Sequence, residues 1–240
     1  ILGLPTRFVQ NDREMVTYQY NDLGQRTSQS RYGQADFFTF SHNDDGTMAS
    51  FEDALNRRTE AQNWKRGAPQ TLIQAKGTPD EITTSQTIDD NGWVTSQTDG
   101  KGYITTLTRD PDMGRLTRIN PPGTWTATDI DYDFSGGGTI QTITKGQAKT
   151  TITYDSMFRT TLEQTQALDT GWSSFVNTAY DSMGRVNFKS FPSSNAYDSD
   201  GTEYLYDALG RPKSQTQTVA PFAQTLTDYL SGHATSVTDP

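Results

Sequence analysis

Acidic residues recur in this sequence in patterns that could carry chemistry. Asp and Glu total 29 of the 240 residues. Two carboxylates facing each other can hydrolyse glycosides, and the loops NDDG (43–46) and DDNG (89–92) offer oxygen ligands of the kind that Ca²⁺ prefers. Neither loop has the twelve-residue length and the terminal Glu of an EF-hand. The recurrence of the acidic residues in one short motif favours a structural role, so we expect no enzyme, no metal site and no cofactor.

That motif is Asp-x-x-Gly, usually preceded by an aromatic or β-branched residue and followed by Arg, as in YDALGR (206–211) and YDSMGR (180–185). Asp or Asn at the first position and Gly at the fourth are typical of a type I turn. Such a turn followed by a residue with positive φ makes a three-residue hairpin loop with a bulge. Gly adopts positive φ without steric cost, and Asn is its usual substitute.

The side chains of the motif have roles in such a turn. The carboxylate can accept hydrogen bonds from backbone N–H groups two residues on. The Tyr before the turn and the Arg after it would lie on paired strands, where the Arg could stack on the ring or meet the Asp. The predicted motif residues are Tyr20, Asn21, Gly24, Asn43, Gly46, Asp53, Asn56, Arg57, Asp89, Gly92, Asp99, Gly102, Asp110, Gly114, Arg115, Tyr132, Asp133, Tyr154, Asp155, Arg159, Tyr180, Asp181, Gly184, Arg185, Tyr206, Asp207, Gly210 and Arg211.

Some copies depart from the pattern. The copy that begins at Asp110 is one residue longer, and Gln25 takes the place of Arg in another. Phe158 occupies the Gly position of YDSMFR (154–159), where we expect a different turn or a longer bulge. The starts of many neighbouring copies lie 10–11 or 22–26 residues apart, as in a ladder of hairpins.

Segments between the turns favour strands. TIQTITK (139–145) and YITTLTRD (103–110) are rich in β-branched and aromatic residues. Other segments, such as SQTQTV (214–219), are polar on both faces, so they cannot form half of a dry sandwich. FEDALNRRTEAQNW (51–64) has helix-forming residues, but the motif places a turn inside it. We therefore predict an all-β fold over residues 1–240, a wound, single-layer ribbon of β-hairpins with solenoid-like repeats and no separate catalytic domain.

Composition excludes several classes of partner. The net charge of −9 repels phosphate backbones, so nucleic acid is not an expected partner. The chain has no cysteine, which excludes disulfides and thiolate metal sites, and no apolar run long enough for a membrane span. The four tryptophans, Trp64, Trp93, Trp125 and Trp172, could form platforms on which sugars stack, or they could pack against the sheet.

The turn motifs resemble the YD repeats of bacterial Rhs proteins, of Tc-toxin shell components and of teneurins. The resemblance rests on YDALGR, YDSMGR, YNDLGQRTSQS (20–30), TDGKGYITTLTRDPDMGRLT (98–117) and NWKRGAPQTLI (63–73), and covers essentially the whole chain. It implies a strand ribbon that spirals into a hollow shell. In the bacterial proteins such a shell encloses a C-terminal toxin, whereas in teneurins it serves cell adhesion.

The resemblance implies a shell segment that encloses or scaffolds a C-terminal toxin domain. Its expected partners are the remainder of the parent Rhs polypeptide and the toxin cargo, and its expected location is secreted or at the bacterial cell surface, as part of a larger exported protein. Open strands at the sheet edges also favour self-association. The alternative is an extracellular carbohydrate-binding or adhesion module built on the same repeats, with glycans as partners.

Overall fold

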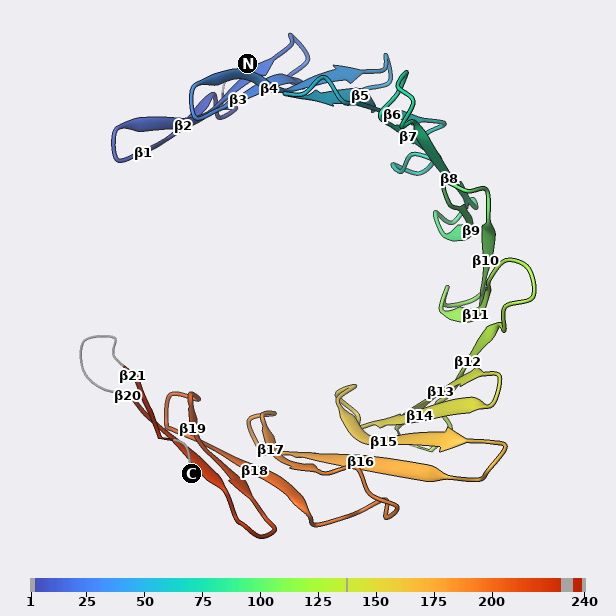
Figure 1. Cartoon of the computed structure of the whole chain (residues 1–240), viewed down its shortest axis with the longest axis vertical. Helices are drawn as coiled ribbons and strands as arrows, with labels where there is room; N and C mark the ends of the chain where they lie inside the picture. The colour runs from blue at the N-terminus through green and yellow to red at the C-terminus, as the bar shows by residue number, and fades with distance from the viewer. Residues whose placement is uncertain (1–2, 137, 230–234, 239–240) are drawn as a thin grey trace. The chain divides into compact units, whose positions relative to one another are not determined.

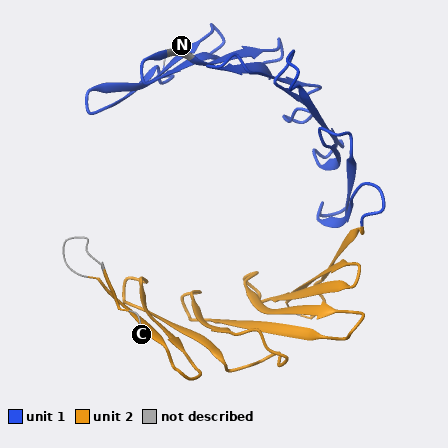
Figure 2. Cartoon of the chain, viewed as in Figure 1, with its two compact units in different colours: residues 1–125 blue, residues 126–240 orange. Residues whose placement is uncertain are grey.

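A computed structural model describes residues 3–136, 138–229 and 235–238 of the chain. Every regular element among these residues is a β-strand, so the predicted all-β class is confirmed. No helix among them has the length and apolar character needed to cross a membrane. The chain forms two compact units, residues 1–125 and residues 126–240 (Figure 2).

Unit 1 is an antiparallel meander in which each strand pairs with the next one along the chain (Figure 1). Its strands are β1 (Arg7–Gln10), β2 (Arg13–Tyr20), β3 (Arg26–Arg31), β4 (Gln34–His42), β5 (Met48–Asp53), β6 (Arg58–Gln62), β7 (Thr71–Gln74), β8 (Ile82–Ile88), β9 (Val94–Thr98), β10 (Ile104–Arg109) and β11 (Leu116–Asn120). Strands β5 and β6 and the turn between them occupy residues 48–62, so the motif predicted this segment better than helix propensity did.

Unit 2 repeats the same plan. Its strands are β12 (Thr128–Asp133), β13 (Thr139–Lys145), β14 (Ala148–Tyr154), β15 (Thr160–Ala167), β16 (Ser173–Tyr180), β17 (Val186–Ser190), β18 (Gly201–Tyr206), β19 (Pro212–Gln217), β20 (Gln224–Tyr229) and β21 (Thr235–Thr238). Among the described residues of each unit, strands contact only the strands beside them, so this part of the chain forms a single layer with no second sheet on either face.

The meander puts alternate turns at opposite ends of the strands. In unit 1 the turns at one end start at Asn21, Asn43, Lys65, Asp89 and Asp110, between 21 and 24 residues apart. In unit 2 they start at Asp133, Asp155, Asp181 and Asp207. The motifs at Asp53 and Asp99 lie at the other end of the unit 1 strands. The repeating unit is therefore a pair of strands, and the shorter sequence intervals arise where both ends of a strand carry the motif.

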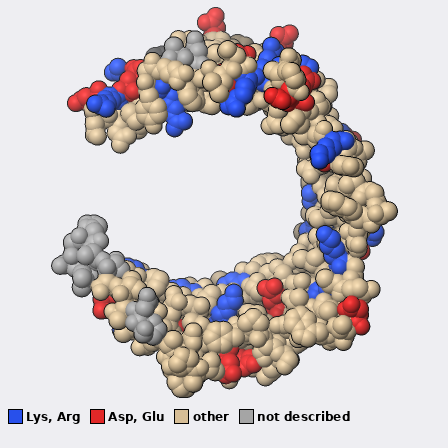
Figure 3. All heavy atoms as spheres, viewed as in Figure 1, with Lys and Arg blue, Asp and Glu red and all other residues tan. Residues whose placement is uncertain are grey.

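Little apolar surface is fully buried in this single layer. Among the described residues, the buried hydrophobic side chains are Ala61, Ile73 and Ile88. Several buried positions hold hydroxyl residues instead, and Ser41 and Ser50 bond across β4 and β5 at 2.6 Å. Most of the visible surface belongs to uncharged residues, with charged side chains dispersed over each unit (Figure 3). Cross-strand pairs, rather than a dry core, must supply most of the stability.

The turn at Phe158 corrects one expectation. Phe158 adopts φ of 58°, and its N–H donates to Asp155 O at 3.0 Å, just as the N–H of Gly184 donates to Asp181 O at 2.9 Å in the next turn. The predicted change of turn or longer bulge is therefore wrong. The ring of Phe158 stays 69% exposed, so the aromatic side chain meets no steric obstacle in this conformation.

Replacing Phe158 with Gly should stabilise the chain. A non-glycine residue in the left-handed region costs about 1–2 kcal/mol, which Gly avoids. Gly has more conformational freedom in the unfolded chain, and the loss of that freedom on folding offsets part of the stability gained. We expect the free energy of unfolding to rise by about 0.5–1 kcal/mol, measured by denaturant titration. The matched control, Gly184→Ala, places a Cβ at φ of 82° and should destabilise the chain. A destabilised Phe158→Gly variant would contradict the strain argument.

Candidate functional site

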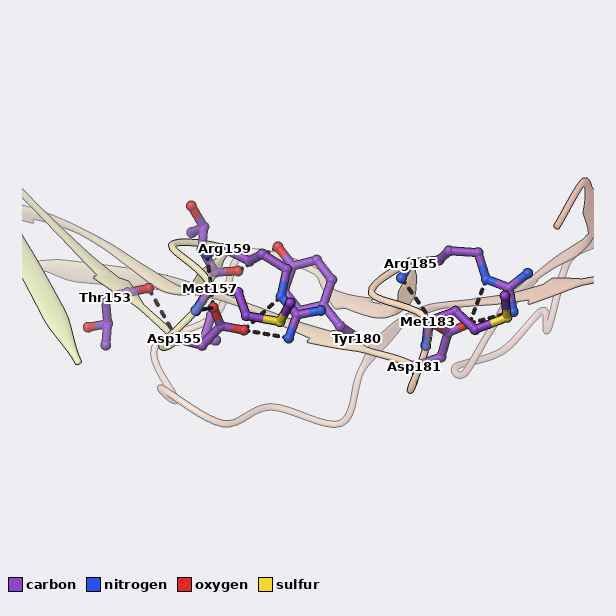
Figure 4. Close-up of polar contacts among 10 residues, drawn as sticks. Thr153, Asp155, Met157, Arg159, Tyr180, Asp181, Met183 and Arg185 are labelled. Atoms are coloured by element: carbon purple, nitrogen blue, oxygen red, sulfur yellow. Dashed lines mark hydrogen bonds and ion pairs between the residues drawn. The ribbon is translucent and has the colours of Figure 1, made fainter. Parts of the chain in front are cut away.

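A single Asp organises the whole loop in three turns of unit 2, of which Figure 4 shows those at Asp155 and Asp181. Oδ1 of Asp181 accepts hydrogen bonds from the backbone N–H groups of Met183 and Arg185, both at 2.9 Å. Its Oδ2 accepts from Nε of Arg185 at 2.7 Å and pairs with Nη2 at 2.6 Å. One carboxylate therefore closes the turn from inside and fixes the direction of the Arg side chain.

The same arrangement recurs in the neighbouring turns of unit 2. Asp155 binds the N–H groups of Met157 and Arg159, and Asp207 binds those of Leu209 and Arg211. Each of these carboxylates also pairs with its Arg at 2.6 Å. The register of the flanking strands shifts by one residue just before each turn, as a bulged three-residue hairpin loop requires.

Each Arg then reaches the Tyr of the following repeat. The guanidinium carbon of Arg159 lies 4.4 Å from the ring centroid of Tyr180, and that of Arg185 lies 4.4 Å from the ring of Tyr206. The last described member of the series is Arg211, 3.9 Å from the ring of Tyr229. The sequence predicted that the Arg would meet its own Asp or stack on the Tyr before its own turn. The contact with the Asp is present, but the Arg stacks on the Tyr that comes 18–21 residues later, so the predicted stacking partner is wrong.

The Tyr hydroxyls bond back to the preceding repeat. Tyr180 donates to the carbonyl of Thr160 at 2.9 Å, and Tyr206 donates to that of Val186 at 2.8 Å. Each acceptor directly follows the Arg on which the ring stacks. We call this series of contacts the Asp–Arg–Tyr ladder, formed by Asp155, Arg159, Tyr180, Asp181, Arg185, Tyr206, Asp207, Arg211 and Tyr229.

The ladder gives the motif glycines a second role. A Cβ on Gly184 would lie 3.1 Å from Nη1 of Arg159, and a Cβ on Gly210 would lie 3.5 Å from Nη1 of Arg185. Gly184 therefore provides the positive φ and also leaves room for Arg159, whereas a Cβ on Gly210 would make an ordinary van der Waals contact with Arg185. Phe158 tolerates its ring because the segment after the preceding turn, FSGGGTIQT (134–142), contains no Arg to cover it.

Unit 1 builds comparable contacts from other residue types. Asn21 closes its turn by accepting from the N–H of Gln25 at 2.9 Å, while its own amide donates to the Gln25 side chain. Arg26 stacks on Phe40 at 4.4 Å. Trp64 donates to Met48 O at 3.0 Å, as the ladder tyrosines do to their acceptors.

The remaining predicted residues occupy turns of the same kind. Asp53 binds the N–H and the guanidinium of Arg57, and the longer loop at Asp110 keeps the ion pair with Arg115 at 3.0 Å. Three more carboxylates accept from the backbone of their own turns: Asp89 from Asn91 and Trp93, Asp99 from Lys101 and Tyr103, and Asp133 from Ser135. The other predicted residues use their side chains: the Tyr20 hydroxyl donates to Pro5 O, the Asn43 amide donates to the Thr47 hydroxyl, and the hydroxyls of Tyr132 and Tyr154 both bond to the Gln141 amide. The glycines at 24, 46, 92, 102 and 114 and Asn56 all have positive φ.

Sequence reasoning missed two features, the turn at Lys65 and the contribution of Tyr229. The turn from Lys65 to Ala68 has two central residues with positive φ, Arg66 and Gly67, and it has no Asp to mark it. Tyr229 completes the ladder contact of Arg211 although its own loop lacks the motif. The interval of 46 residues between Asn43 and Asp89, about twice the repeat length, was the available signal for the turn at Lys65.

The electrostatics of the ladder suit structure better than acid–base chemistry. The Arg185 guanidinium, which donates to the carboxylate, holds the pKa of Asp181 below its usual range, and Arg159 does the same for the pKa of Asp155. For Asp207 the largest cause of the lowered pKa is the backbone N–H of Arg211. Among the described residues no group of three acidic or histidine side chains is arranged to hold a metal ion.

Unit 1 also contains a groove of about 690 Å³ on the face of β7 to β10. Leu72, Gln86, Gln97, Asp99, Tyr103 and Trp125 are among the residues that line it. Trp125 is 75% exposed and Tyr103 58% exposed, so both rings present free surface to a ligand.

The lowered pKa values predict acid sensitivity. A carboxylate whose pKa is lower in the folded chain adds stability above its unfolded pKa, near 4, and that stability is lost as the pH falls through the folded pKa. The thermal unfolding midpoint should stay level from about pH 7 to 5 and fall below about pH 4. An Asp155→Asn, Asp181→Asn, Asp207→Asn variant should lose part of this slope in calorimetry. An unchanged slope would contradict the assignment.

The Tyr hydroxyl contact is testable by a single-atom deletion. Tyr206→Phe removes the bond to Val186 O but keeps the ring over Arg185, so unfolding should become easier by about 1 kcal/mol in a denaturant titration. Tyr204→Phe is the matched control, because the Tyr204 hydroxyl has no hydrogen-bond partner in the described parts of the chain, and it should change stability by only a few tenths. Equal effects of the two variants would count against the contact.

Comparison with known proteins gives one class of match. No protein-family model matches the sequence, and no curated protein does. Among solved structures, that of TcdB2–TccC3 with Cdc42 covers 94% of this chain with a TM-score of 0.72 and 16% identity. A Photorhabdus luminescens Tc holotoxin pore and TcdB2–TccC3 itself match with the same values.

The chain spans 14% of the length of each of these matched chains. Identity at this level establishes a shared fold and no more. The chain therefore has the fold of a segment of these Tc toxin proteins.

Proposed function

We propose that this chain is a wall segment of a hollow shell that encloses a toxin domain of the same polypeptide. The observation that carries the proposal is the single-layer ribbon of hairpins, which shares its fold with Tc toxin proteins over nearly the whole chain. A single layer without an apolar core is poorly suited to form a compact globular domain, but it is suited to act as a wall between an interior and the surrounding solvent. Its partners in this role are the remainder of the parent polypeptide and the enclosed toxin, and its place is outside the producing cell.

The role is structural rather than catalytic. The carboxylates that recur along unit 2 are held by turn N–H groups and by Arg, and their lowered pKa values keep them ionised at neutral pH. An ionised carboxylate whose oxygens already accept two to four hydrogen bonds is a poor general acid and a weak base. The same contacts disfavour acid–base catalysis by these carboxylates and hold the turns in one shape, as a wall requires.

Limited proteolysis of the parent polypeptide tests the enclosure. The toxin segment should resist protease while the wall is intact and should become cleavable when Asp155, Asp181 and Asp207 are replaced together by Ala, because the turns then lose their internal bonds. A Ser156→Ala, Ser182→Ala variant, which changes turn residues but spares the carboxylates, serves as the control. Equally fast digestion of the toxin segment in the unmodified polypeptide would reject enclosure.

The groove in unit 1 supports a second candidate, a carbohydrate-binding module. Exposed faces of Trp125 and Tyr103 can stack on the apolar face of a sugar ring, while Gln97 and Asp99 offer hydrogen bonds to its hydroxyls. The groove volume is within the range of ligand pockets.

A glycan array separates the two candidates. Carbohydrate binding predicts hits that disappear in Trp125→Ala and persist in Trp172→Ala, because Trp172 is equally a surface tryptophan but belongs to unit 2. An array without hits rejects the second candidate and leaves the first untouched.

A further inference from the structure

Two rows of exposed apolar side chains mark the two ends of the strands in unit 2. The methionine row consists of Met157, Met183 and Leu209, at the turns between β14 and β15, β16 and β17, and β18 and β19. These side chains are 70–78% exposed. The aromatic row consists of Trp172, Tyr197 and Phe222, in the turns at the opposite strand ends, and these side chains are 57–78% exposed.

The two rows have the same spacing. Successive members of each row sit on turns that are two strands apart in one ladder, on the order of 10 Å. Both rows belong to the same meander. When the strand ends of one copy of unit 2 face the strand ends of another copy, the three apolar side chains of one row can therefore lie opposite the three of the other row. Exposed apolar patches of this kind are typical of interaction sites.

Burying these turns leaves few polar groups without partners. In the methionine row, the N–H groups of Met157, Met183 and Leu209 already donate to the Asp that starts each turn. In the aromatic row, the N–H groups of Trp172, Tyr197 and Phe222 donate to Thr170, Asn195 and Val219. A contact between turns usually loses free energy through unsatisfied backbone groups, and these six N–H groups do not add to that cost.

Chemistry favours pairing of unlike rows. Thioether sulfur makes favourable contacts with aromatic rings, and flexible Met side chains adapt to uneven partners. The aromatic row is flanked by acidic residues, including Asp169 and Asp200, so two aromatic rows would bring like charges together. The methionine row carries Arg paired with Asp in every turn and so adds no such repulsion.

We propose that the methionine row of one copy of this chain docks on the aromatic row of a second copy, in a head-to-tail contact. A contact between unlike surfaces leaves one free row at each end of the assembly, so it adds further copies rather than closing a dimer. This interface is separate from pairing through the open strands β1 and β21, and it requires no toxin cargo.

Sedimentation velocity of the whole chain over about 1–100 μM tests the contact. The unmodified chain should form dimers and larger species as its concentration rises. A methionine-row variant, Met157→Gln, Met183→Gln, Leu209→Gln, and an aromatic-row variant, Trp172→Ser, Tyr197→Ser, Phe222→Ser, should each stay monomeric. Their equimolar mixture should form dimers and nothing larger, because each variant keeps one intact row.

A matched control and a second measurement keep the test decisive. Leu23→Gln, Met113→Gln removes apolar side chains from turns at one strand end of unit 1, where Asp45 and Asn91 interrupt the row, and should associate as the unmodified chain does. Since the chain has no cysteine, Met183→Cys and Tyr197→Cys chains mixed under mild oxidation should cross-link to each other at least ten-fold more than either does to itself.

Three outcomes would overturn the proposal. The unmodified chain would remain monomeric over the whole concentration range, or either row variant would associate as strongly as the unmodified chain, or the mixed Cys chains would cross-link no better than each alone. If a row variant associates as strongly as the unmodified chain, the association would be assigned to the open strands instead. Far-UV circular dichroism verifies that both variants keep the sheet, and the single Cys substitutions remain informative if a triple variant does not fold.

Discussion

The bond between one carboxylate and the backbone of its own turn is the constraint on which the rest of this structure depends. The strands are largely polar, so burial alone specifies their register weakly. Asp181 specifies the register through the turn instead, because its Oδ1 accepts hydrogen bonds from two N–H groups of one loop and so favours one geometry for the hairpin. Since the loop sets the register of both flanking strands, a short motif at each turn determines how a whole pair of strands aligns.

The second oxygen of that carboxylate links one repeat to the next. It orients Arg185 over the ring of Tyr206, and the Tyr206 hydroxyl returns to the strand that follows Arg185. Each contact joins neighbouring repeats only, as in other repeat proteins whose stability is a sum of local and nearest-neighbour terms. The loss of one contact is therefore confined to its neighbourhood, which is why the chain accommodates Gln25 in an Arg position and Phe158 in a Gly position.

The turns and strands were predictable from the sequence because their cause is local. Asp or Asn followed by Gly fixes a hairpin loop within five residues, and the residue types between the loops favour strands. The partner of each Arg was not predictable, because Arg159 and Tyr180 are brought together by the width of a strand pair and not by the motif. The turn conformation at Phe158 was not predictable for a related reason. The preference for Gly at this position combines the positive φ with the space that a neighbouring Arg needs, and the preceding turn segment FSGGGTIQT (134–142) supplies no Arg to Phe158.

The contrast between local turn signals and contacts made elsewhere also explains why the apolar turn residues could not be assigned a role from the sequence. Met183 sits between Asp181 and Gly184, where turn chemistry accepts almost any side chain, so its type carries no folding information. A residue that the fold does not require, that is large and apolar, and that stays exposed in three successive turns has to be explained by something outside the turn. The ladder satisfies the polar groups of each loop internally, and in doing so it leaves the tip of the loop free to present an apolar side chain. Turns whose own Asp accepts their N–H groups can thus present an apolar side chain at the tip, and in unit 2 they provide the surface on which we propose that a second copy docks.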